Sequence, residues 1–199
     1  MLDLHKEKFK KIENFVGKFF SFLPLKPNQY TLLSIFFSFF VLYFLVKQNL
    51  IFSALFFLIA SFLDFVDGAI ARYKNLSTKL GAYLDTICDR YVESALLFGM
   101  LFLPLPKIFL SKELWLFLIF LGSQMTTYAK AAAKEKELVV QELKGGILSR
   151  SERLLLLLLA LIVGIFNLYW TTVVLIFVAI LSNLTAIQRI LMTLKSSQK

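Results

Sequence analysis

Four aspartates lie close together in a stretch of the sequence that is otherwise strongly apolar. They are Asp64, Asp67, Asp85 and Asp89. The flanking segments 51–63 and 94–105 are rich in Leu, Ile and Phe. One charge at the centre of a bilayer costs roughly 2.5–3.5 kcal/mol on insertion scales, so four unpaired carboxylates would cost about 10 kcal/mol. Two arginines, Arg72 and Arg90, are too few to balance four carboxylates, and bound cations are therefore the expected means of neutralising the aspartates.

The spacing of the aspartates indicates that two helix faces carry them. Residues three and four positions apart share one face of a helix. The face that ends one helix would hold Asp64, Asp67, Gly68 and Ala71. The face that opens the next helix would hold Gly81, Asp85 and Asp89. Two such helices in contact would bring the four carboxylates together, beside small residues that let a bulky ligand approach the backbone.

These residue types favour a metal-dependent phosphate site. Carboxylates without His or Cys partners suit hard cations, Mg²⁺ or Mn²⁺. Several carboxylates can hold two such ions, which stabilise phosphoryl transfer. Arg72 follows Ala71 in the sequence and is placed to bind a phosphate. A purely structural or ion-conducting acid cluster would not explain the accompanying glycines and Arg72.

The composition excludes a soluble globular protein. The chain has 199 residues, 58% of them hydrophobic, and 22 Phe, with a mean hydropathy of +0.74. These values predict an all-α polytopic membrane protein. Cys88 is the only cysteine, which excludes an internal disulfide, and we expect it to be a packing residue. His5 is the only histidine and lies near the N-terminus, so catalysis by histidine is not expected.

The net charge of +9 could suggest nucleic acid, but the positions of the basic residues indicate a membrane topology instead. Eighteen of the 22 Lys and Arg residues fall before Asn28, at 72–79, at 130–153 and after Thr185. These places alternate with segments that hold few basic residues, which is the positive-inside pattern. The pattern predicts a multi-pass protein of the cell membrane with both termini and the active site on the cytoplasmic side.

The first 23 residues predict an amphipathic helix at the membrane surface. Apolar residues recur at steps of three and four, with lysines on the other face. Such a helix lies in the interface rather than across the bilayer. No apolar run there is long enough for a cleavable signal peptide. Pro27 then interrupts the helix, and Asn28 is a suitable N-cap for the next one.

Residues 24–199 predict a single membrane domain of six transmembrane helices. A span needs about 20 apolar residues. The uncharged run 154–188 is too long for one span and is divided near 164–169. The six predicted spans cover residues 28–47, 49–72, 80–104, 112–134, 148–167 and 169–193.

The acidic segment resembles the signature of the CDP-alcohol phosphotransferase family, D-x2-D-G-x2-A-R-x8-G-x3-D-x3-D. Every specified position matches, namely Asp64, Asp67, Gly68, Ala71, Arg72, Gly81, Asp85 and Asp89. The expected six spans and surface helix are also similar to that family, so the resemblance extends over essentially the whole chain. The resemblance implies transfer of a phosphoalcohol group from a CDP-alcohol to a second alcohol, with release of CMP.

The resemblance also implies roles for individual residues. Two Mg²⁺ ions, or Mn²⁺, would be held by Asp64, Asp67, Asp85 and Asp89. Asp89 would also act as the general base on the acceptor hydroxyl, with Asp85 beside it as a catalytic residue. The CDP-lipid would contact Pro27, Asn28, Gln29, Tyr30, Thr31, Gly68, Ala71, Arg72, Thr78 and Gly81. A homodimer is expected from the family.

A second cluster of polar residues suggests the acceptor. The cluster comprises Thr127, Lys130, Arg150, Arg153 and Arg189. A cationic pocket beside a metal site suits an acceptor that carries its own phosphate. These residues resemble the phosphatidylinositol-phosphate and archaetidylinositol-phosphate synthase branch, in which the acceptor is inositol 1-phosphate. Thr127 stands where that branch has Ser, a change that keeps the hydroxyl group.

Three other functions remain open from the sequence. The same fold could use a different acceptor, such as glycerol 3-phosphate or another alcohol. A Mg²⁺-dependent intramembrane prenyltransferase also uses two acidic motifs, but it would release pyrophosphate. A cation transporter could use the four acids as an ion pathway, although Gly68, Ala71 and Arg72 favour a phosphorylated ligand. The donor lipid could be archaeol-based or diacylglycerol-based.

Overall fold

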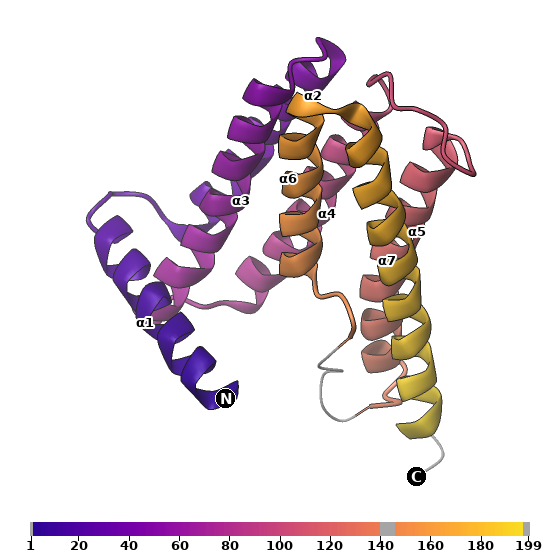
Figure 1. Ribbon diagram of the computed structural model, residues 1–199. Coiled ribbons are helices and arrows are strands. Elements are labelled where there is room, and N and C mark those ends of the chain that lie inside the picture. Colours follow the sequence, from indigo (N-terminus) through magenta and orange to yellow (C-terminus); the bar gives the residue numbers. More distant parts are fainter. Residues whose placement is uncertain (1, 140–145, 197–199) are drawn as a thin grey trace. The chain divides into compact units, whose positions relative to one another are not determined.

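The computed structural model describes residues 2–139 and 146–196, and the described residues form helices joined by short connections (Figure 1). The helices are α1 (Leu2–Phe20), α2 (Pro27–Val46), α3 (Leu50–Tyr73), α4 (Lys79–Met100), α5 (Lys112–Glu135), α6 (Arg150–Phe166) and α7 (Leu168–Ser196). No β-strand occurs in these residues beyond one isolated bridge, between Ile108 and Leu110. The predicted all-α class is confirmed.

Helices α2 to α7 lie at the positions of the six predicted spans. Among the described residues, α2, α3 and α7 are long and apolar enough to cross a membrane. The remaining three spans stay a prediction. Helix α4 ends at Met100 rather than at residue 104, because the chain turns before Pro104. Helix α1 ends at Phe20, three residues before its predicted end.

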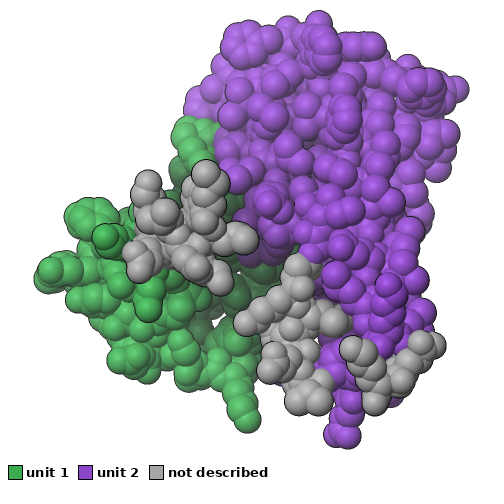
Figure 2. Space-filling view, turned by 60° about the horizontal axis from the view of Figure 1, so that its bottom comes forward, with its two compact units in different colours: residues 1–43, 55–96 green, residues 44–54, 97–199 purple. Residues whose placement is uncertain are grey.

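The chain divides into two compact units, which Figure 2 shows in different colours. Unit 1 comprises residues 1–43 and 55–96, and unit 2 comprises residues 44–54 and 97–199. Unit 1 therefore holds α1 and most of α2, α3 and α4. Unit 2 holds α5, α6 and α7.

The core of unit 1 forms where α1 packs on α2 and α3. Tyr30, Val66 and Ile70 are buried at its centre, with Val16 and Phe20 of α1 packed against them. The predicted apolar face of α1 is therefore divided between two environments. Its inner part contacts the other helices, whereas three residues of its outer part stay exposed, Ile12, Phe15 and Phe19.

Unit 2 is built on the close packing of α5 against α7 (Figure 1). At Gly122 of α5, an added Cβ would lie 2.8 Å from the backbone nitrogen of Asn183. Small residues at such points let membrane helices approach closely. The break between α6 and α7 falls at Asn167, whose side chain accepts a hydrogen bond from the Tyr169 backbone nitrogen at 2.8 Å. The predicted division near 164–169 is thus confirmed.

We expect Gly122→Leu to destabilise unit 2. The new side chain would collide with backbone atoms of α7, and overpacking of this kind typically costs about 1–3 kcal/mol. Thermal unfolding in detergent should show a lower midpoint than for the wild type. The control is Ala131→Leu, at an exposed position of the same helix. An equal midpoint for both variants would contradict the close contact of α5 and α7.

Candidate active site

Three of the four predicted aspartates come together in unit 1. Asp64 and Asp67 lie near the end of α3, and Asp85 lies near the start of α4. Each offers a carboxylate oxygen, and these oxygens lie within 4.8 Å of one another. Only 4% of the Asp67 surface is exposed to solvent. A group of three converging carboxylates, one of them buried, is suited to holding a hard divalent cation.

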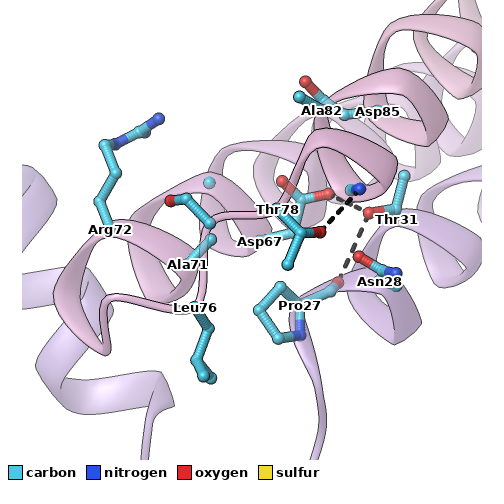
Figure 3. A pocket seen from close by; sticks show the side chains of 13 residues that line it. Pro27, Asn28, Thr31, Asp67, Ala71, Arg72, Leu76, Thr78, Ala82 and Asp85 are labelled. Carbon is cyan, nitrogen blue, oxygen red and sulfur yellow. Dashed lines mark hydrogen bonds between the residues drawn. The ribbon is translucent and has the colours of Figure 1, made fainter.

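Thr31 of α2 orients the buried carboxylate. Its Oγ1 donates a hydrogen bond to Oδ2 of Asp67 at 2.5 Å (Figure 3). Residues that hold a ligating carboxylate in place are as much part of a metal site as the ligands themselves. Thr31 thus links α2 to the carboxylate group.

A pocket of about 130 Å³ opens beside the carboxylates. It is lined by thirteen residues from α2, α3, α4 and the connection between α3 and α4 (Figure 3). Eight of the ten residues predicted to bind the CDP-lipid are among them: Pro27, Asn28, Thr31, Gly68, Ala71, Arg72, Thr78 and Gly81. The predicted metal ligands Asp67 and Asp85 line it too.

Two glycines of the pocket lining have polar atoms close to their bare backbone. A Cβ added to Gly68 would lie 2.9 Å from Nη2 of Arg72. A Cβ added to Gly81 would lie 3.1 Å from Oγ1 of Thr78 and 3.2 Å from Oδ1 of Asn28. The polar atoms around both glycines can therefore approach a ligand lying over the bare backbone.

Gln29 and Tyr30 do not line this pocket. The Gln29 side chain accepts a hydrogen bond from the Lys26 backbone nitrogen at 2.7 Å, which closes the turn before α2. The Tyr30 ring is buried in the core, and its hydroxyl lies 3.4 Å from the Phe20 carbonyl oxygen. Consecutive residues of a helix point in different directions, so the contiguous stretch 27–31 could not all face one ligand.

Three residues of the pocket were not predicted, namely Leu76, Ser77 and Ala82. Leu76 and Ser77 belong to the connection between α3 and α4, where the signature specifies no residue type. Ala82 follows Gly81, and its small side chain gave no distinct chemical signal. All three residues reach the pocket because the connection between α3 and α4 and the first turn of α4 pass beside it.

Asp89 lies one turn beyond Asp85 on α4 and is buried. It is not a member of the group of three carboxylates described above. One turn further on, Glu93 is 1% exposed and forms an ion pair with Arg90 at 3.1 Å. Glu93 was not predicted as a site residue, although its spacing from Asp89 puts it on the same helix face. The acidic face of α4 is therefore longer than the predicted pair of aspartates.

The predicted acceptor residues lie in unit 2. Nη1 of Arg189 donates to the carbonyl oxygen of Thr126 at 3.0 Å, which joins α7 to α5. Oγ1 of Thr127 is turned toward its own helix, 3.5 Å from the Ser123 carbonyl oxygen. Lys130 is partly buried near the end of α5. Gly145, which begins the predicted Gly-Gly motif, lies outside the described residues.

The chain entering α6 is bound to α7. The backbone nitrogen of Ile147 donates to the Gln188 side chain at 3.1 Å, and that of Leu148 donates to Oγ1 of Thr185 at 2.9 Å. Ser149 then caps α6 in a capping box with Glu152. These contacts hold the start of α6 beside the part of α7 that carries Arg189.

The start of α6 brings two arginines to this place. Arg150 is its first residue, and Arg153 is only 1% exposed although its side chain is basic. Arg153 and Arg189 are close enough for their charges to repel each other. The Nε of Arg189 is buried and has no hydrogen-bond partner among the described residues. A cluster of this kind is suited to an anion, and a phosphate would satisfy several donors at once.

Comparison with known proteins decides the family. The family model of the CDP-alcohol phosphatidyltransferases matches residues 25–194, which is most of the chain. The chain belongs to the CDP-alcohol phosphatidyltransferase family. It is therefore a transferase of phospholipid synthesis, and family members use a CDP-linked donor and an alcohol acceptor. The resemblance inferred from the aspartate signature is confirmed.

Two curated CDP-alcohol phosphatidyltransferases differ in the acceptor that their names state. The archaetidylinositol phosphate synthase of Pyrococcus horikoshii is 32% identical over 196 residues, covering 96% of this chain and 95% of that protein. A CDP-diacylglycerol–glycerol-3-phosphate 3-phosphatidyltransferase of Aquifex aeolicus is 30% identical, covering 85% of this chain and 90% of that protein. Family membership therefore leaves the acceptor open.

A solved CDP-alcohol phosphatidyltransferase has the same fold. The phosphatidylinositol phosphate synthase PgsA1 of Mycobacterium tuberculosis, crystallised with CDP-DAG bound, superposes with a TM-score of 0.76 at 25% identity. The match covers 92% of this chain and 94% of that one. A second crystal structure of PgsA1, in complex with manganese and citrate, superposes with a TM-score of 0.77 and covers 92% and 88% of the two chains, again at 25% identity.

We expect Thr31→Val to weaken metal binding. The substitution removes the hydroxyl that orients Asp67, and losing such a partner typically lowers metal affinity roughly 10- to 100-fold. Titration with Mn²⁺, followed by the paramagnetic resonance signal of the free ion, measures the affinity. The control is Ser38→Ala, because Ser38 is buried in the same helix but donates only to the Ile35 carbonyl oxygen. Unchanged affinity in Thr31→Val would argue against a metal at Asp67.

Proposed function

We propose that this enzyme transfers a phosphatidyl-type group from a CDP-linked lipid to inositol 1-phosphate, with release of CMP. The group is diacylglycerol phosphate or archaeol phosphate. The observation that carries the choice of acceptor is that the start of α6, which holds Arg150 and Arg153, is hydrogen-bonded to the part of α7 that carries Arg189. Inositol-phosphate synthases among the relatives support the same choice.

The donor occupies the pocket of unit 1 in this proposal. Gly68, Ala71 and Gly81 leave room for the nucleotide, and Asn28, Arg72 and Thr78 supply polar contacts. The guanidinium of Arg72 binds a phosphate oxygen. The lipid enters sideways from the bilayer, and its tails remain among the exposed apolar residues of the membrane helices.

Two Mg²⁺ ions are proposed as cofactors, with Mn²⁺ as a possible substitute. Asp64, Asp67 and Asp85 fit such ions because their oxygens converge, and Asp89 is the proposed fourth ligand. Manganese in the PgsA1 crystal structure supports a divalent cation in this family. Bound there, the ions would neutralise the diphosphate and the charge that develops during transfer.

Asp89 is the proposed general base. A hydroxyl is a weak nucleophile at neutral pH, and a positioned carboxylate can take its proton. The acceptor oxygen attacks the phosphorus that carries the lipid, and the bond from that phosphorus to the CMP oxygen breaks. The proton passes to the carboxylate of Asp89, which is buried on the same face of α4 as Asp85.

The acceptor phosphate is bound by the basic residues of unit 2. Lys130, Arg150, Arg153 and Arg189 supply the charge, and Thr127 supplies a hydroxyl. The unsatisfied Nε of Arg189 is a donor that such a phosphate would use. Glycerol 3-phosphate is the second candidate, because the Aquifex aeolicus relative is named for that acceptor.

The setting is proposed as the cell membrane, with the active site and both termini on the cytoplasmic side. The exposed Ile12, Phe15 and Phe19 of α1 suit a helix lying in the interface, with residues 1–23 as the juxtamembrane segment. Residues 24–199 form the membrane domain of six spans. A homodimer is proposed from family membership alone.

The reaction is tested by identifying the product. Purified enzyme is incubated with Mg²⁺, a CDP-lipid and inositol 1-phosphate, and the lipid product is identified by mass spectrometry. We expect the inositol phosphate lipid together with an equal amount of CMP. CDP-archaeol and CDP-diacylglycerol are compared as donors. Faster CMP release with glycerol 3-phosphate would overturn the proposed acceptor and leave the donor chemistry standing.

Substitutions at the acceptor cluster should affect one substrate only. We expect Lys130→Ala and Arg150→Ala to raise the acceptor KM at least about tenfold, since each removes a charge-assisted bond. The KM for the CDP-lipid should change less than about twofold. Lys136→Ala is the control, because Lys136 is exposed and, among the described residues, forms an ion pair with the exposed Glu135 beside it. Equal effects on both substrates would contradict the assignment.

A further inference from the structure

Arg72 of the signature is held by a residue of α1. The Nε of Arg72 donates a hydrogen bond to Oε1 of Glu13, and the two side chains form an ion pair. The Arg72 side chain is 59% exposed, whereas that of Glu13 is only 15% exposed. Glu13 is therefore the less exposed partner of this ion pair.

The packing of α1 on α3 brings Glu13 to this position. A Cβ added to Gly17 would lie 2.6 Å from the Ala69 carbonyl oxygen and 2.8 Å from the Tyr73 Cβ. The two helices therefore touch at Gly17. Glu13 precedes Gly17 by one helical turn and lies on the same face. A second bond, from Nζ of Lys74 to the Ser21 carbonyl oxygen at 2.8 Å, fixes the other end of the contact.

The terminal nitrogens of Arg72 lie over Gly68, which lines the donor pocket. A Cβ at Gly68 would lie 2.9 Å from Nη2 and 3.3 Å from Nη1 of Arg72, so both nitrogens lie over this glycine. Gly68 and Arg72 both line the pocket, and Figure 3 shows Arg72 at its margin. One nitrogen of the guanidinium thus faces α1, and the other two lie where a ligand over Gly68 would meet them.

We propose that Glu13 is a positioning residue for the donor. By binding Nε it holds the long Arg72 side chain in one conformation, with Nη1 and Nη2 ready to contact the diphosphate. An unrestrained arginine would lose rotamer freedom when the donor binds, and that loss weakens binding. The inference rests on the proposed role of Arg72 in donor binding. It assigns to α1 a part in substrate recognition.

The test compares kinetic constants of variants of the full chain. Glu13→Gln is expected to raise the KM for the CDP-lipid about threefold to tenfold, a modest effect because Arg72 is largely exposed. The kcat and the acceptor KM should stay within about twofold of the wild type. Glu13→Asp, which keeps the charge, should restore part of the donor affinity. Lys11→Gln, at an exposed position of the same helix, is the control.

A second variant tests the same inference without changing the Glu13 side chain. Gly17→Ala places a methyl group against the α3 backbone, so it displaces α1 and should raise the donor KM in the same way. The double variant Glu13→Gln/Arg72→Gln should bind the donor no worse than Arg72→Gln alone, because Glu13 acts only through Arg72.

Two results would overturn the inference alone. One is a donor KM in Glu13→Gln equal to that of Lys11→Gln while Arg72→Gln is impaired. The other is a lower donor KM in Glu13→Gln, which would make Glu13 a competitor of the donor for Arg72. A donor KM unchanged in Arg72→Gln would instead refute the proposed donor site, and the role of Glu13 with it.

Discussion

The structure depends on keeping carboxylates inside helices that are otherwise apolar. A charge removed from water needs a compensating partner, and without one it destabilises the fold by several kcal/mol. Two buried acids of unit 1 meet this need in different ways. Asp67 accepts a hydrogen bond from Thr31, and Glu93 pairs with Arg90. The convergence of Asp64, Asp67 and Asp85 creates a demand for positive charge that a divalent cation would fulfil.

The fold also requires small residues, because the buried carboxylates and their partners lie on different helices that must come close together. Carboxylates on different helices can converge only where their backbones come close. Close approach of the backbones is also needed for the polar residues around the carboxylates. Gly17 lets α1 touch α3, Gly68 gives Arg72 a bare surface to cross, and Gly81 leaves room for Thr78 and Asn28. At all three positions an added Cβ would meet another atom at 3.1 Å or less, so the glycines are needed for contact.

Much of the fold and of the acidic site could be predicted, because both follow from local patterns. Helices α2 to α7 lie where apolar runs and helix breakers place them, and the spacing of Asp64, Asp67 and Asp85 fixes their common faces. Prediction was weaker where neighbouring residues of the sequence were all expected to contact the same ligand. Tyr30 lies beside Thr31 in the sequence, yet helical rotation turns its ring into the core.

Tertiary contacts gave no signal in the sequence. Glu13 resembles any glutamate on an amphipathic helix, and only the crossing of α1 over α3 brings it to Arg72.

The two units hold clusters of charges of opposite sign. The acids of unit 1 repel one another, and so do Arg153 and Arg189 of unit 2. The proposed ligands of opposite charge would relieve both repulsions, and binding and stability would then be linked. The charges that are costly to bury are therefore the same charges that the proposed cation and phosphate ligands would contact.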